Sequence, residues 1–253
     1  SFTVHITDNQ ISTERMILQQ LLENPVRGIL SEGCKTCMPT PNHDLYDRLA
    51  DKGTSVVFFH GNYSNMPDYP FIKDDNYGGG YYLGKYLSTL GHRKIAGIFK
   101  RDDVQGIERY FGFLSALRDE NLPFCEECIG FYDTVQLASL QKRQDTAFLS
   151  EFILKQLKDA TAVVCYNDEI AYWLMKELTC KNLRVPEDVS VVCFDNTYLS
   201  ELSSTQLTSL SHKNHEMGST AAQMLIKLMK GSSVSSQKLS WHLTVKRSCR
   251  SVP

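Results

Sequence analysis

The chain has 253 residues, of which 42% are hydrophobic and 22% are charged, and its formal net charge is −2. These values are typical of a globular protein with a substantial core and one or two domains. The small net charge gives no electrostatic argument for nucleic-acid binding by this chain alone. No apolar run is long enough to span a membrane and no secretory leader is visible, so we expect no membrane partner.

Short β-branched runs alternate with amphipathic stretches in the first third of the chain, which indicates an α/β fold. Either Ser12 or Thr13 can cap the first helix, and Pro25 ends it. A later helix that starts at Asp75 ends at Gly91, a residue type that favours helix carboxyl termini. The strands predicted here are residues 2–6, 28–30 and 55–59, and the helices are residues 12–24, 44–49 and 75–91.

A glycine triplet, Gly78-Gly79-Gly80, stands at the start of that last helix. It superficially suggests a phosphate-binding loop, but it lacks the Lys-Ser/Thr of a P-loop and the GxGxxG spacing of a dinucleotide site. Close packing of the helix against a neighbour explains the glycines better. We therefore expect no nucleotide.

Residues 162–196 carry the clearest pattern in the chain. Two short apolar runs flank a segment with helical periodicity, and strand, helix and strand in this spacing predict a βαβ unit in a parallel sheet. Ligands of such sheets bind beyond the carboxyl ends of the strands, where Asn167 and Asp195 stand. The strands predicted in the second half are residues 95–99, 128–132, 163–166, 189–194, 207–210 and 241–245, and the helices are residues 105–120, 144–157, 170–178 and 215–229.

Several motifs follow one another along the chain: LGHRKIA at 90–96, Arg109-x-x-Gly112-Phe113, YNDEIA at 166–171, RVPEDVSVVCFDN at 184–196 and LTS at 207–209. In this order they resemble the effector-binding domain of the lactose/galactose repressor family of bacterial transcription regulators. Two further motifs, GIFKxDDxQG at 97–106 and SHK at 211–213, are similar to the arabinose-responsive branch of that family. The resemblance implies a sugar effector, with L-arabinose as the inducer.

The resemblance also implies a type I periplasmic-binding-protein-like fold. Two similar Rossmann-like α/β lobes with parallel sheets would face each other across a cleft, joined by three crossovers. The family's first strand and first helix have no counterpart before Phe2, and its DNA-binding domain is not in this chain. The expected N-terminal lobe is residues 1–92 plus 212–238, and the expected C-terminal lobe is residues 93–211 plus 239–253.

A site for a sugar needs carboxylates and amides, an Arg that donates in a fixed fork, and an apolar wall. Arg109, Asn167 and Asp195 supply these polar groups, and the resemblance places them among the family's effector contacts. Asp103 and Gln105 occupy the loop before Arg109, while His212 and Lys35 match polar positions of relatives. The predicted ligand-binding residues are therefore Arg109, Asn167, Asp195, His212, Gln105, Asp103 and Lys35.

Each candidate can instead have a purely structural role. Asn167 or Asp168 can cap the helix that follows, and Asp168 is the better candidate for that role. Arg109 can form an ion pair with Glu108 or Asp102. A turn role is open to Asp195, an exposed linker position to His212, and core or surface positions to the possible stacking residues Tyr63, Tyr132 and Tyr166.

The eight cysteines include two C-x-x-C pairs, Cys34 with Cys37 and Cys125 with Cys128. Such spacing is found in zinc sites, but two pairs roughly ninety residues apart make a weak zinc signal. Cys165 and Cys193 lie in apolar runs and fit small core residues. We expect reduced thiols, no metal and no cofactor.

The resemblance therefore implies a cytoplasmic, sugar-sensing effector-binding and dimerisation domain of a bacterial repressor, which contacts operator DNA only through a domain outside this chain. The alternative is a sugar-binding protein of a transport system, which shares the fold. An enzyme such as a sugar isomerase is disfavoured, because the chain has no G-x-S-x-G, no H-E-x-x-H and no set of metal ligands.

Overall fold

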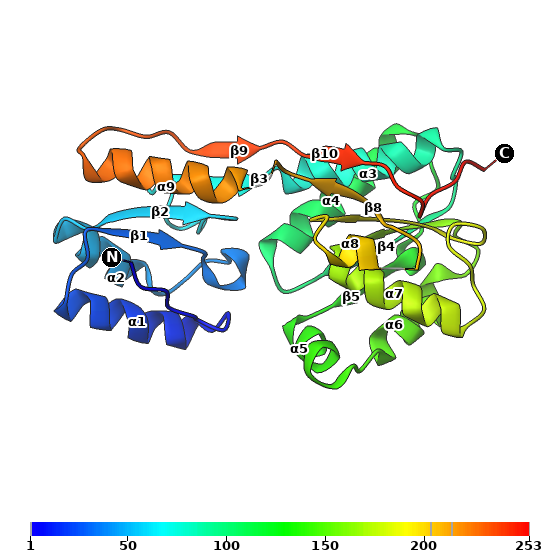
Figure 1. The fold of residues 1–253 in the computed structure, drawn as a ribbon, viewed down its shortest axis with the longest axis horizontal. Coiled ribbons are helices and arrows are strands. Elements are labelled where there is room, and N and C mark those ends of the chain that lie inside the picture. Colours follow the sequence, from blue (N-terminus) through cyan, green and yellow to red (C-terminus); the bar gives the residue numbers. More distant parts are fainter. Residues whose placement is uncertain (1, 203, 214, 253) are drawn as a thin grey trace. The chain divides into compact units, whose positions relative to one another are not determined.

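The computed structural model of the protein describes residues 2–202, 204–213 and 215–252 (Figure 1). The chain divides into two compact units, each treated below by itself. Unit 1 consists of Ser1–Asp74 and Lys213–Leu239, and unit 2 of Asp75–His212 and Ser240–Pro253. No helix in the described ranges is long and apolar enough to cross a membrane.

Unit 1 is a parallel sheet in the order β1-β2-β3-β9, with helices on both faces (Figure 1). Alternate residues of β2 point to opposite faces: Val56 and Phe58 pack with α1 and α2, and Val57 packs with α9. The elements of unit 1 are α1 (Ile11–Glu23), β1 (Gly28–Ser31), η1 (Cys34–Thr36), α2 (His43–Asp51), β2 (Ser55–Phe59), β3 (Phe71–Asp74), α9 (Glu216–Met229) and β9 (Gln237–Leu239).

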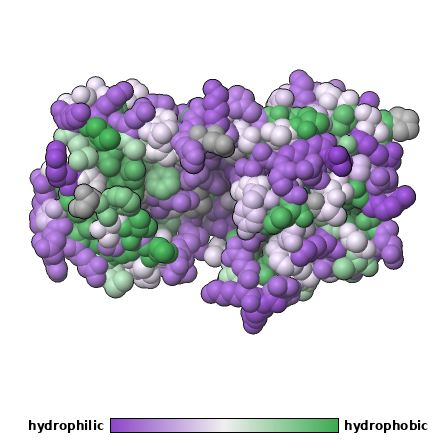
Figure 2. All heavy atoms as spheres, in the orientation of Figure 1, coloured by the Kyte–Doolittle hydropathy of each residue, from purple (hydrophilic) through white to green (hydrophobic). Residues whose placement is uncertain are grey.

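The amino-terminal segment differs from its prediction. Residues 2–6 form no strand, and Phe2, Val4 and Ile6 are 90%, 73% and 73% exposed. Alternating apolar residues make a strand only where a neighbour pairs with the backbone, and no described strand does so here. Hydrophobic side chains gather on this face of unit 1, around the amino-terminal segment (Figure 2). The helix that follows begins at Ile11, without a side-chain cap from Ser12 or Thr13.

Unit 2 has three layers, a six-stranded sheet between two helical layers (Figure 1). One core packs α3 and α4 on the sheet, and the other packs α6 and α7 on its opposite face. The elements are α3 (Asn76–Thr89), β4 (Ile95–Lys100), α4 (Val104–Asp119), η2 (Glu126–Cys128), β5 (Ile129–Tyr132), α5 (Thr134–Arg143), α6 (Ala147–Phe152), η3 (Ile153–Leu157), β6 (Ala162–Cys165), α7 (Asp168–Cys180), β7 (Ser190–Phe194), α8 (Leu199–Leu202), β8 (Thr208–Ser211) and β10 (His242–Thr244).

The sheet of unit 2 has the order β10-β8-β7-β6-β4-β5 and is parallel except for the β10–β8 pair. After β4 the chain adds β5 on one side and then β6, β7 and β8 on the other. The direction of winding therefore reverses between β4 and β6. In open parallel sheets this reversal, at the carboxyl ends of the strands, is where ligands bind.

The division of the chain also differs from the expected lobes. The first passage between units was expected near residue 92, but the structure places it between Asp74 and Asp75. The cause is α3, which packs along α4 because glycines remove the side chains between them. A Cβ atom at Gly80 would overlap the carbonyl oxygen of Arg109, so this glycine of the triplet serves helix packing, as the sequence indicated. The later passages follow His212 and Leu239, one residue from the expected 211 and 238.

Several short elements were missed or displaced. The helix expected at residues 144–157 begins at Ala147 and continues as a π-helical turn, and α5 before it was not predicted. β3 and β9 fall in stretches where the sequence predicted no strand. A missed signal for α5 is its capping box, in which Asp133 and Gln136 satisfy each other's backbone amides.

Candidate functional site

The winding reversal in unit 2 gathers most of the predicted site residues at one edge of its sheet. Asp103, Gln105 and Arg109 follow β4, Asn167 follows β6, and Asp195 follows β7. All three strands are parallel neighbours, so their carboxyl ends meet at the same edge. Lys35 lies in η1 of unit 1, where its backbone amide donates to Asn9 Oδ1 at 2.5 Å, and its ligand role stays a prediction.

Arg109 is the centre of this group. It projects from α4, is 2% exposed, and is hydrogen-bonded on three sides. Its Nε donates to Asn76 Oδ1 at 3.0 Å, Nη1 to the carbonyl oxygen of Tyr166 at 2.5 Å, and Nη2 to Asp195 Oδ1 at 3.5 Å. The contact with Asp195 is an ion pair across the sheet edge, which the sequence did not suggest. Together these bonds hold the guanidinium in one orientation.

Aromatic rings surround the same guanidinium. Its carbon lies 4.1 Å from the ring centre of Phe194, 4.8 Å from that of Tyr166 and 5.6 Å from that of Trp241. A cation over aromatic faces is attracted by their quadrupoles, at about 2 kcal/mol or more where water is removed. The rings therefore stabilise a buried cation and fix the direction of its donors.

Asp195 gives the group its more accessible polar face. Its side chain is 35% exposed, and its contact with Arg109 at 3.5 Å is at the limit of a hydrogen bond. Its backbone has φ of 83°, the left-handed region, and Asn196 follows at 48°. Asp195 is thus a turn residue, and the turn also aims its carboxylate at the Arg109 fork.

Asp103 has a structural role in this structure. It is 1% exposed and caps α4 by accepting from the Gly106 amide at 2.6 Å. It also accepts from the Tyr166 hydroxyl at 3.0 Å and pairs with Lys100 Nζ at 3.1 Å. Burial, followed by the charge of Asp103, raises the pKa of Tyr166, so this hydroxyl stays a donor. Gln105 Oε1 lies 3.4 Å from the same hydroxyl.

The cap of α7 is Asn167, whereas the sequence favoured Asp168 for that role. Asn167 is the residue that caps α7, since its Oδ1 accepts from the Ile170 amide at 3.1 Å. Asp168, expected as the cap, is buried and accepts from the Thr197 amide at 2.5 Å and from Ser200 Oγ at 3.1 Å. It therefore holds the segment just after Asp195, and the ligand role of Asn167 stays a prediction.

His212 is packed rather than an exposed linker residue. Its ring stacks on Trp241 with centres 3.9 Å apart and planes inclined by 26°, and its Nδ1 lies 3.1 Å from the Ser240 carbonyl oxygen. Trp241 in turn donates from Nε1 to the Asp75 carbonyl oxygen at 3.0 Å. His212 thus extends the aromatic group around Arg109 by way of Trp241.

Sequence reasoning missed Asn76 and Trp241, and it left core and surface positions open for the three tyrosines, all of which are buried. Asn76 follows the N-cap of the predicted helix that begins at Asp75, and Trp241 directly precedes β10. Tyr132 is fully buried beside Tyr166, and its hydroxyl has no hydrogen-bond partner within the described part of the chain. An unpaired buried hydroxyl costs about 1–3 kcal/mol, so it marks unused donor capacity near Tyr166.

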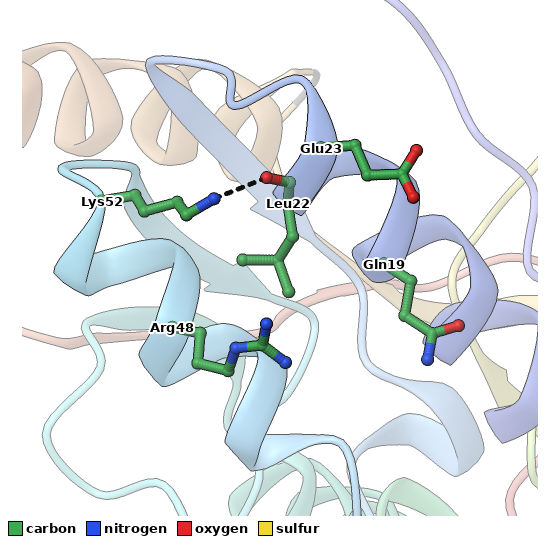
Figure 3. A pocket seen from close by; sticks show the side chains of 5 residues that line it. All are labelled: Gln19, Leu22, Glu23, Arg48 and Lys52. Carbon is green, nitrogen blue, oxygen red and sulfur yellow. Dashed lines mark hydrogen bonds between the residues drawn. The ribbon is translucent and has the colours of Figure 1, made fainter.

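A hollow on the surface of unit 1 lies away from these residues. It has a volume of about 590 Å³, lies between α1 and α2, and is lined by none of the predicted ligand residues (Figure 3). Lys52, one of the cations that line the hollow, already donates to the Leu22 carbonyl oxygen at 2.8 Å. Among the residues that the structure describes, no group of three or more His, Cys, Asp and Glu could hold a metal ion.

At the winding reversal of a parallel sheet stand a buried fork of donors, an accessible carboxylate and an aromatic wall, groups that can donate to, accept from and pack against a polar ring. The chain belongs to the periplasmic binding protein-like domain family, whose sequence model matches residues 85–249. The predicted α/β fold with mostly parallel sheets is thereby confirmed, and so is the family resemblance read from the motifs.

Two similar proteins are named as transcriptional repressors. The chain is 34% identical over 224 residues to the arabinose metabolism transcriptional repressor of Halalkalibacterium halodurans, covering 88% of this chain and 58% of that protein. It is 34% identical over 229 residues to the repressor of the same name from Geobacillus stearothermophilus, covering 90% and 62%. The chain therefore spans about three fifths of the length of these relatives.

A solved structure of a transcription regulator has a similar fold. The transcription regulator CcpA of Lactococcus lactis is similar with a TM-score of 0.78 and 25% identity, over 97% of this chain and 86% of that chain. These similar proteins are named as transcriptional regulators and not as enzymes, which supports the expectation of a non-catalytic domain.

Proposed function

We propose that this chain is the sugar-binding effector domain of a bacterial transcriptional repressor, with L-arabinose as its inducer. The observation that carries the proposal is Arg109, buried and fixed by Asn76 and Tyr166, with the accessible carboxylate of Asp195 beside it. An Arg fork donates to one sugar hydroxyl, and the carboxylate beside it accepts from the neighbouring hydroxyl. The names of the two arabinose repressors support the choice of sugar.

Selectivity would come from the same buried groups. A sugar with a misplaced hydroxyl leaves a charged donor or acceptor unpaired, and such a loss discriminates strongly between similar ligands. The ring of Trp241, with His212 stacked on it, offers an apolar surface for the C–H face of a sugar. Gln105, Asp103 and Asn167 would then orient the primary contacts from the turns around them.

Regulation requires that the sugar bind one of two conformations better than the other. A coupling of about 1–3 kcal/mol between effector and operator is typical of such systems. We propose that operator contact lies in the part of the relatives that this chain does not match, and that the protein acts in the cytoplasm as a homodimer. The alternative, a sugar-binding protein of a transport system, would bind sugar with no linked change in DNA affinity.

The test is calorimetric titration of the purified chain with L-arabinose, D-xylose and D-galactose. Saturable binding of arabinose alone, lost in Asp195→Ala, is the expected result. Binding of another sugar at the same residues would contradict arabinose as the effector and would still support the proposed effector site. Absence of binding by all three, from a chain shown to be folded by circular dichroism, would contradict the proposal.

A second experiment separates the repressor from the transport protein. The natural gene that encodes this chain is expressed in full, and binding to its own upstream DNA is measured with and without the sugar. Sugar-dependent release of the DNA is expected. DNA binding that does not change at saturating sugar would exclude the proposed regulatory role.

A further inference from the structure

The two C-x-x-C pairs lie in turns with the same backbone closure. The Cys37 amide donates to the Cys34 carbonyl oxygen at 3.0 Å, and the Cys128 amide to the Cys125 carbonyl oxygen at 2.9 Å. A turn closed in this way brings its first and fourth Cα atoms within about 7 Å, and disulfides span Cα separations of about 4.4–6.8 Å. Backbone closure alone therefore permits a disulfide in both turns, and the side chains must distinguish them.

The first pair is sealed and its thiols have other neighbours. Cys34 and Cys37 are each 2% exposed. The Cys34 thiol is hydrogen-bonded with Thr7 and Tyr63 rather than with Cys37. Cys37 itself has φ of 74°, in the left-handed region, which turns its side chain away from the regular course of the turn. Both residues of this pair are sealed from solvent, so an oxidant has no access to their thiols.

The second pair, Cys125 and Cys128, differs in its exposure and in the contact that its thiols make. Cys125 is half-buried and Cys128 is buried, and both pack on the same core of unit 2. The Cys128 thiol is hydrogen-bonded with the Cys125 side chain. The turn η2 between them leads directly into β5, an edge strand of the sheet. An accessible thiol thus stands beside a buried one, the arrangement in which one sulfur reacts first and the other resolves it.

Charges around the second pair favour the same division of roles. Lys94 and Lys158 both lie within electrostatic reach of the two sulfurs. Burial, with the Cys125 contact next, nevertheless raises the pKa of Cys128 to about 11, so its thiol keeps the proton. Each lysine also meets a carboxylate, Lys94 with Asp159 and Lys158 with Glu127.

We propose that Cys125 and Cys128 form a redox-active dithiol whose oxidant is hydrogen peroxide. The Cys125 thiolate attacks one peroxide oxygen and breaks the O–O bond, which gives a sulfenic acid on Cys125 and releases the other oxygen as water. The Cys128 sulfur then attacks the Cys125 sulfur and displaces its oxygen as a second water, forming the S–S bond. Two electrons pass from the sulfurs to the peroxide, and the two thiol protons end in the two waters.

The test uses the whole chain, reduced under nitrogen and then treated with hydrogen peroxide. After unfolding, remaining thiols are alkylated and the peptides are mapped by mass. The expected product is a Cys125–Cys128 disulfide, about 2 Da lighter than the dithiol, with Cys34 and Cys37 still alkylated. Equal oxidation of the Cys34–Cys37 pair, or oxidation of Cys125 to sulfinic acid without a disulfide, overturns the proposal.

Two serine variants assign the roles of the sulfurs. Cys128→Ser removes the resolving thiol, so a sulfenic acid on Cys125 should accumulate and be trapped by dimedone. Cys125→Ser should leave Cys128 unmodified, and the matched control Cys34→Ser should oxidise like the unchanged chain. A Cys128→Ser protein that is folded by circular dichroism yet traps no dimedone would contradict the assigned order.

Discussion

Unit 1 buries the carboxylate of Glu14 and unit 2 buries the guanidinium of Arg109, and the two charges are held in different ways. Glu14 is 3% exposed and accepts from Tyr46 at 3.0 Å, Tyr63 at 2.7 Å and Asn42 at 2.8 Å. These partners are neutral donors inside unit 1. Burial, with the charge of Glu14 next, raises the pKa of both tyrosines, which keeps them protonated.

Arg109 has a different set of partners. Two of its bonds go to fixed, buried acceptors, while the third goes to Asp195, whose side chain reaches solvent. A closed network of neutral donors around a charge serves stability. A network that ends in an exposed carboxylate places a charged acceptor within reach of a ligand. We therefore propose that Glu14 is a structural buried charge and Arg109 a ligand-binding one, and the following predictions test that proposal.

The largest effect, a loss of stability, is expected from a change in unit 1. Glu14→Ala leaves two tyrosine hydroxyls and an amide without their acceptor, and unpaired buried groups cost about 1–3 kcal/mol each. The free energy of unfolding should fall by about 3 kcal/mol or more, measured by urea titration. The exposed Glu23 on the same helix is the control, and Glu23→Ala should change stability by less than about 0.5 kcal/mol. Equal effects of the two variants would refute the closed network.

In unit 2 the main effect should fall on ligand affinity. Arg109→Lys keeps the charge but loses the planar fork, and hydrogen bonds to charged groups are worth about 1.5–3 kcal/mol. Affinity for the sugar should drop by about a hundredfold in the titration. Arg118 on the same helix is exposed and pairs with Asp119, so Arg118→Lys should bind normally. Normal binding by Arg109→Lys would show that its buried charge, like that of Glu14, is only structural.

A smaller loss of sugar affinity is expected from a change at Asp168, the residue that holds the turn at Asp195. Asp168→Asn replaces the carboxylate that accepts from Thr197 and Ser200, so the turn should hold its geometry less tightly. We expect about a tenfold loss of sugar affinity, or about 1.4 kcal/mol. The neighbouring Glu169→Gln, whose partner is Gln141, should leave affinity unchanged. An unchanged affinity in Asp168→Asn would place the control of Asp195 elsewhere.

The smallest effect is a change in how the stability of the protein depends on pH, and it does not involve the candidate site. His92 is buried in unit 2, and desolvation is the main reason that its pKa lies below the usual value of about 6.5. The folded state thus disfavours its protonation. Stability should be complete above about pH 6.5 and should fall as the pH drops from there through the lowered pKa. In His92→Gln this part of the pH dependence of urea unfolding should disappear, and its persistence would assign it to another group.

Part of the fold followed directly from sequence patterns. The β7 run around Val191 and the α7 periodicity around Leu174 are buried on their predicted faces, because apolar spacing depends only on local geometry. The same local logic placed Asn167 and Asp195 just beyond the carboxyl ends of their strands. The alternation at Val4 and Ile6 was equally regular and gave no strand, because a strand also needs a paired neighbour.

The sequence by itself determined the α/β class, most helices and strands, and the residue types at the carboxyl ends of β4, β6 and β7. Tertiary structure decided which of them meet. Trp241 joins the group around Arg109 although the two lie far apart in the sequence, and Asn167 rather than Asp168 became the cap. Periodicity and propensity describe neighbours along the chain, whereas partners across it are set by strand order and by which backbones the glycines allow to approach.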